Sequence, residues 1–143
     1  MKIFVINPGS TSTKLALFEN EKVIWAAGAH HSSEDLQHFH HVNEQYEYRR
    51  DFIFRLLAEA GIPIEFDAVI ARGGLLKPTP GGVYAINEQM KYDLLHARME
   101  HACNLGALIA DEMAKNAVAP LILPTRKWWM SCSRQRVIPV SPR

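Results

Sequence analysis

The sequence KIFVINPGSTSTKLALF, at residues 2–18, decides the fold of this chain. Its first part, residues 2–6, is a β-branched and aromatic run that predicts a buried strand ending at a turn with proline and glycine. Residues 13–18 then alternate polar and apolar side chains, as a second strand would. A third run, KVIWAA at residues 22–27, follows a polar turn. The opening is therefore predicted to be a meander of three strands joined by tight turns.

The pattern downstream alternates helices and strands. Residues 67–71 (DAVIA) predict a further buried strand, and residues 77–86, with two prolines and a pair of glycines, predict a loop or a hairpin. Apolar side chains recur at helical spacing in three segments: residues 34–61, with a helix over much of 44–60, residues 87–99, and residues 101–116. This order indicates an α/β fold in which helices flank a mixed sheet.

Composition excludes several classes of function. The chain has 143 residues, 48% of them hydrophobic, and a net charge of +1, so there is no basic surplus for nucleic acid or an anionic membrane. Its two cysteines, Cys103 and Cys132, suggest no disulfide framework, and no apolar run is long enough to span a bilayer. We therefore expect a soluble cytoplasmic protein with neither nucleic acid nor membrane as a partner.

The turn NPGSTSTK, between the first two predicted strands, is the strongest local signal for function. Free backbone amides, hydroxyl groups and one lysine converge there, and such a set suits a phosphoryl group. The turn is not a Walker A loop, because it has one glycine and precedes a strand. The alternative is a serine- and threonine-rich hairpin with a solvated lysine. The candidate phosphate-binding residues are Asn7, Gly9, Ser10, Thr11, Ser12, Thr13 and Lys14.

Arg72, Gly73 and Gly74 form a second candidate site at the end of a predicted strand. An arginine beside two glycines can hold a carboxylate or phosphate in a bidentate fork, and ligands collect at strand ends in open α/β sheets. His101 and Asn104, three residues apart, share one face of a helix and are a third candidate. An exposed turn arginine and a helix-capping pair are the alternatives.

Five histidines between residues 30 and 41 raise the possibility of a metal site. The cluster has no cysteine or carboxylate pattern around it, so a polar loop is the preferred interpretation and no metal ligand is assigned. The histidines are His30, His31, His38, His40 and His41.

These pieces together resemble the butyrate kinase family, in the acetate kinase branch of the actin/hexokinase-like fold, which is of the ribonuclease H type. The resemblance is carried by KIFVINPGSTSTKLALFE, VIARGGLLKPTPGGVYAIN and EHACNLGALIADEMA, in family order across residues 1–120. It implies transfer of a phosphoryl group from ATP, with Mg²⁺, to butyrate or another short-chain fatty acid. It also implies a homo-oligomer for the full-length protein.

The resemblance assigns roles to individual residues. The turn after the first strand would hold the phosphoryl group in transit, Arg72 would be catalytic by contacting the acyl carboxylate and the phosphoryl group, and His101 and Asn104 would lie beside the active site. For the turn itself, the resemblance singles out Asn7, Ser10, Ser12 and Lys14. A non-enzymatic phosphate- or carboxylate-binding module, and a sugar or polyol kinase of the same superfamily, are the alternatives.

The chain also departs from the family. Family members are more than twice as long, and their second domain binds the adenosine. Their catalytic aspartate lies on the strand after the last helix, in a segment like AYIADPxVVDEL, where this chain reads PLILPTRKWWMSC. We therefore expect a truncated amino-terminal domain over residues 1–120, inactive by itself, followed by an aberrant and poorly ordered tail over residues 121–143.

A shift of reading frame by one base near Pro120 would explain that tail. Trp128 and Trp129 are adjacent and cannot both face one core. Tryptophan and methionine have single codons, so Trp128-Trp129-Met130 is encoded by TGG TGG ATG. Regrouped one base earlier, these bases force Val-Asp, and the neighbouring codons permit the rest of AYIADPEVVDEL.

Overall fold

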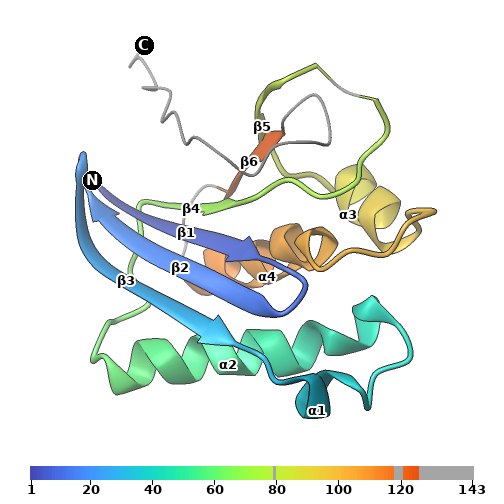
Figure 1. Ribbon diagram of the computed structural model, residues 1–143. Coiled ribbons are helices and arrows are strands. Elements are labelled where there is room, and N and C mark those ends of the chain that lie inside the picture. Colours follow the sequence, from blue (N-terminus) through green and yellow to red (C-terminus); the bar gives the residue numbers. More distant parts are fainter. Residues whose placement is uncertain (79, 118–120, 126–143) are drawn as a thin grey trace.

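The computed structural model describes residues 1–78, 80–117 and 121–125, which form a mixed sheet with helices packed on it (Figure 1). The strand order is β3-β2-β1-β4-β6-β5. The strands are β1 (Lys2–Pro8), β2 (Ser12–Glu19), β3 (Lys22–His30), β4 (Ala68–Ala71), β5 (Gly82–Ala85) and β6 (Leu121–Thr125). The helices are α1 (Ser33–Leu36), the 3₁₀ helix η1 (Val42–Gln45), α2 (Tyr46–Glu59), α3 (Glu88–Leu95) and α4 (Cys103–Ala117).

The amino-terminal meander and the strands after it meet at β1. Strand β1 pairs antiparallel with β2 and parallel with β4, and β4 pairs parallel with β6. The four strands expected within residues 2–6, 13–18, 22–27 and 67–71 are all present. The prediction of a mixed sheet is confirmed.

Helices α2 and α4 cover one face of this sheet (Figure 1), and the hydrophobic core lies between these helices and the sheet. Alternate residues of each strand enter that core, as the period of two requires. The Phe4 ring stacks on the Phe66 ring, with centroids 4.8 Å apart. Residues between them, such as Ile3, Val5 and Ala16, point to the opposite face and are only partly buried. The strand side chains of the core are Phe4, Ile6, Leu15, Leu17, Val69 and Ala71.

Two predicted helices are shorter than expected. The segment 34–61 divides into α1, η1 and α2. At the break, Glu44 accepts a hydrogen bond from the His40 amide at 2.8 Å, and Glu100 accepts one from the Val42 amide at 2.9 Å. The helix expected over 87–99 ends at Leu95. The Glu100 contact joins residues 58 apart in the chain, which helical spacing does not contain.

The carboxyl-terminal segment continues the sheet farther than expected. Residues 121–125, just after the predicted domain boundary at residue 120, form β6 between β4 and β5. Residues 82–85, within the predicted loop or hairpin, pair with it as β5. The run LILPT is apolar enough to occupy a sheet position. The rest of the predicted tail, residues 126–143, lies outside the described residues.

None of the helices in the described part of the chain combines the length and the apolar character needed to cross a bilayer.

Candidate functional site

The tip of the β1–β2 turn is exposed and tightly closed. The Gly9 amide donates to the Ser12 carbonyl at 2.6 Å, and the His31 amide donates to the Thr11 carbonyl at 2.9 Å. Ser10 and Thr11 are exposed, and no acceptor within the described residues takes up their backbone amides. The turn therefore presents free N–H groups and hydroxyls at the surface, as an anion site requires.

Arg49 of α2 lies directly behind the turn. Its side chain is 0% exposed, and its Nη1 donates to the Gly9 carbonyl at 2.9 Å while Nη2 donates to the Ser10 carbonyl at 2.8 Å. Nε donates to Gln45 Oε1 at 3.0 Å. Burial lowers the pKa of the guanidinium from its usual value. Arg49 was not among the candidate residues, although its spacing with the buried Ile53 places it on the core-facing side of a helix.

Thr13 is separated from the other hydroxyl groups of the turn. It is buried, and its Oγ1 accepts from Arg49 Nη1 at 3.2 Å and lies 2.9 Å from His31 Nε2. The opposite nitrogen of His31 is 3.3 Å from the Tyr48 hydroxyl. Thr13 thus faces the helices, whereas Ser10 and Thr11 are exposed. His31 is itself buried, and in this it differs from the polar loop expected for the histidine cluster.

The buried His31 predicts a loss of stability at acidic pH. Desolvation, followed by the Arg49 charge, lowers the pKa of His31 from 6.5 to about 4. The folded state disfavours the protonated imidazole. The neutral His31 therefore contributes fully to the free energy of unfolding above pH 6.5, and this contribution is lost as the pH falls toward 4. The resulting loss in the free energy of unfolding is about 3 kcal/mol at most. Urea unfolding at pH 7.5 and 4.5 should show a smaller loss of stability for His31→Gln than for the unsubstituted chain. Equal losses would contradict the prediction.

Three polar side chains form a row across the sheet beside the turn. Asn7 is the register partner of Lys14, and in an antiparallel pair such partners point to the same face. Ile6 pairs with Ala71, and both side chains are buried against the helices. The next residues, Asn7 and Arg72, therefore lie side by side on the opposite face of the sheet. Lys14 and Arg72 are exposed, and Asn7 Oδ1 is buried with no partner among the described residues. Two cations and an unpaired amide oxygen therefore meet where β1 and β4 end.

Asn104 anchors the loop that follows Arg72. Its Oδ1 accepts from the Leu75 amide at 2.9 Å, and its Nδ2 donates to the Met99 carbonyl at 3.3 Å. It is 3% exposed. Asn104 therefore positions the loop from inside the protein, while Gly73 is half-buried within that loop.

Gly74→Ala is expected to destabilise the chain by about 1–3 kcal/mol. A Cβ there would lie 2.6 Å from Leu94 Cδ2 and 2.8 Å from Asn104 Cα, so the loop would have to leave α4. Gly28→Ala is the control, since a Cβ at that position meets nothing within 4 Å. Urea unfolding of both variants measures the difference. Equal midpoints for the two variants would contradict the close packing of Gly74 against α4.

His101, just before α4, is held in its neutral form. Burial, then the charges of Arg72 and Arg49, lower the pKa of its imidazole. Its Nδ1 accepts from the Cys103 amide at 3.2 Å and lies 2.9 Å from Cys103 Sγ. The neutral ring then carries its proton on Nε2, which is available as a donor. The Cys103 thiol has its pKa raised by burial and stays protonated.

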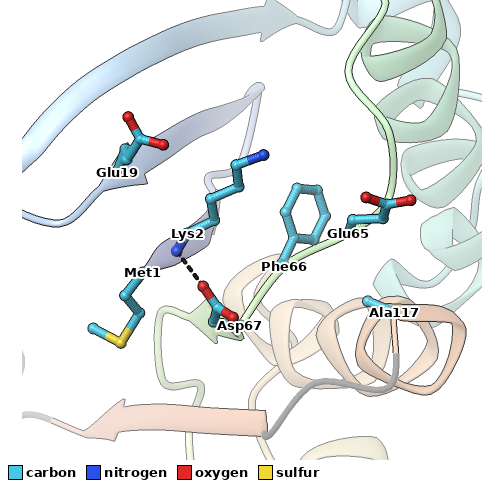
Figure 2. Close-up of a pocket in the computed structure, with 7 residues that line it drawn as sticks. All are labelled: Met1, Lys2, Glu19, Glu65, Phe66, Asp67 and Ala117. Carbon is cyan, nitrogen blue, oxygen red and sulfur yellow. Dashed lines mark hydrogen bonds between the residues drawn. The ribbon is translucent and has the colours of Figure 1, made fainter.

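One further recess in the surface lies away from the row of Asn7, Lys14 and Arg72. Figure 2 shows a polar recess lined by Met1, Lys2, Glu65, Asp67 and other residues, where the Lys2 amide donates to Asp67 Oδ2 at 2.5 Å. It lies where β1 and β4 begin, at the end of the sheet opposite the turn. Within the described ranges, no group of three or more histidine, cysteine, aspartate or glutamate side chains could hold a metal ion.

Comparison with known proteins gives both a sequence and a structural relationship. No protein-family model matches the chain. Over 120 residues it is 79% identical to a probable butyrate kinase from Phocaeicola vulgatus, covering 84% of this chain and 34% of that protein. A probable butyrate kinase from Bacteroides thetaiotaomicron is 56% identical over 114 residues, 80% of this chain and 32% of that protein. The chain thus spans about a third of the length of these relatives.

Among solved structures, an acetate kinase from Entamoeba histolytica superposes with a TM-score of 0.55 at 15% identity, covering 87% of this chain and 34% of that one. At this identity the likeness concerns the fold alone. The fold is the ribonuclease H-like fold of the actin/hexokinase type, as the resemblance implied.

Proposed function

Because the chain belongs, over its 120 matched residues, to the butyrate kinase family, we propose that it supplies the phosphoryl- and acid-binding part of a short-chain carboxylic acid kinase. In that reaction a carboxylate oxygen of butyrate bonds to the γ-phosphorus of ATP as the bond to the bridging oxygen breaks. The products are butyryl phosphate and ADP. The observation that carries the proposal is that the β1–β2 turn, Lys14 and Arg72 lie together at the end of the sheet where β1 and β4 end.

The turn fits a phosphoryl group in transfer. The free amides of Ser10 and Thr11 can donate to its equatorial oxygens, and the hydroxyls of Ser10 and Ser12 add further donors. Lys14 contributes an exposed cation from the neighbouring strand position. Phosphoryl transfer needs positioning and charge neutralisation more than covalent chemistry from the protein, and these groups supply both.

Arg72 and His101 suit the acid substrate. The guanidinium fork of Arg72 can hold a carboxylate oxygen and a phosphoryl oxygen together, which draws the nucleophile toward phosphorus. The neutral His101, with its proton on Nε2, can donate to the same developing charge. Preference among butyrate, isobutyrate and similar acids depends on methylene groups, which a pocket separates weakly.

ATP and Mg²⁺ would need residues beyond this part of the protein. The described residues carry no carboxylate cluster for a metal ion. We therefore assign the adenosine site and the metal ligands of the whole enzyme to its other parts. The resemblance also leads us to expect a cytoplasmic homo-oligomer that acts on a short-chain fatty acid.

A chimera tests this function. Residues 1–117 are joined to the remaining two thirds of the Phocaeicola vulgatus relative, and butyryl phosphate is measured as its hydroxamate with ATP, Mg²⁺ and butyrate. We expect turnover within about tenfold of the relative, since the two are 79% identical over the exchanged part. A folded chimera that turns over glycerol or a sugar but not butyrate would favour a polyol or sugar kinase. A folded chimera with no turnover, from a chain that still binds phosphate, would favour the binding module.

A further inference from the structure

The buried arginine behind the turn has no role in the function proposed above. We propose that Arg49 is a positioning residue of the phosphate site, which orients the turn and supplies an unneutralised positive charge to the bound anion. The inference rests on the proposed function, because it assumes that the turn binds a phosphoryl group.

The charge of Arg49 has no counter-ion within the described residues. Its hydrogen bonds run only to neutral oxygens, namely three backbone carbonyls, the Thr13 hydroxyl and the Gln45 amide. Its neighbour Arg50, in contrast, pairs with Asp51 and Glu112. A fully buried cation without an opposite charge is costly to fold. An anion on the outer side of the turn would repay that cost, so the binding site and the buried charge stabilise one another.

The hydrogen bonds of Arg49 also explain the direction of the turn amides. The carbonyl of Gly9 and the amide of Ser10 belong to one trans peptide group, so they point in opposite directions. The carbonyl of Ser10 and the amide of Thr11 are related in the same way. Because Arg49 draws both carbonyls inward, at 2.9 and 2.8 Å, both amides are directed outward. These are the amides that find no acceptor in the described chain.

Arginine suits this task better than lysine. The guanidinium has donors on three nitrogens in a fixed plane, and here Nε, Nη1 and Nη2 each take different acceptors. One side chain thereby connects α2 to Gly9, Ser10 and Thr13. A lysine would keep the charge and lose part of this connection, which allows the two contributions to be separated.

The experiment uses the ¹⁵N-labelled 143-residue chain and inorganic phosphate as the probe. NMR follows the Ser10 and Thr11 amides and the Arg49 guanidinium protons during titration. Arg49→Gln removes the charge and is expected to weaken phosphate binding by about tenfold or more, whereas Arg49→Lys should lose less than about fivefold. Two substitutions in the same helix serve as controls. Arg55→Gln removes an exposed charge and Ile53→Val removes a buried methyl group, and neither should change the affinity.

Each outcome decides the proposal. An Arg49→Gln chain that binds phosphate within about twofold of the parent would make Arg49 merely structural and leave the proposed function intact. An Arg49→Lys chain that is folded but as weak as Arg49→Gln would overturn the charge argument. If Arg49→Gln does not fold, the parent chain still decides, because its guanidinium protons must shift with the same dissociation constant as the two amides. A parent chain without any phosphate-dependent shift at Ser10 and Thr11 would overturn both this inference and the proposed function.

Discussion

Arg72→Ala in the chimera is expected to lower kcat/KM for butyrate by about a hundredfold to a thousandfold. The exposed guanidinium follows β4 beside Asn7, on the face that also carries Lys14. Alanine leaves that position without a charge for the carboxylate or for the transferred phosphoryl group. The hydroxamate assay measures the loss, and most of it should appear in kcat, because the charge is needed most at the transition state.

Two further variants make this test specific. Arg72→Lys keeps the charge without the fork and should retain intermediate activity. Lys22→Ala removes an exposed cation where β3 begins, away from the turn, and should leave kcat/KM unchanged. Thermal unfolding of Arg72→Ala should match that of the parent chimera, since the side chain is exposed. A loss below about tenfold would remove Arg72 from the proposed chemistry.

The 143-residue chain by itself is expected to form no detectable butyryl phosphate, roughly ten-thousandfold or more below the chimera. In the proposed function, the described residues bind the acid and the phosphoryl group, and they carry no carboxylate cluster for a metal ion. Without a partner to hold ATP, the γ-phosphate is not positioned against the acid. The same assay, run with excess chain and with phosphate binding measured in parallel, gives the comparison. Sustained turnover by the purified chain would refute the prediction.

The nucleotide sequence tests why this chain differs from its relatives after α4. We propose a one-base shift of reading frame near Pro120. The alternate frame should then encode VVDEL followed by a long open frame, and restoring it should give activity without any foreign segment. Residues 121–125 still form β6, so an out-of-frame segment would have kept enough apolar character for one strand. If the alternate frame encodes neither feature, the tail needs another origin.

Local patterns predicted the architecture well where burial repeats with a short period. The alternation in residues 13–18 and the apolar run in 2–6 each predicted a strand that is present, because a strand buries every second residue or both faces. The helix at 101–116 was predicted for the same reason, from its apolar spacing, and α4 covers Cys103–Ala117. The helix boundaries were less accurate, since Glu44 and Glu100 intercept amides near the start of η1.

The sequence by itself determined which groups are available at the candidate site: a turn rich in hydroxyls, a lysine after it, and an arginine beside glycines. Only the tertiary structure decided which of them face one another. Thr13 was placed with the phosphate-binding hydroxyls, yet the strand period directs it to the helices, where Arg49 and His31 bind it. Arg49 and the turn carbonyls are about forty residues apart in the chain, and Asn104 is 29 residues from the amide it holds. Such contacts depend on how α2 and α4 pack on the sheet, because hydrogen-bond partners follow distance in space and not spacing along the chain.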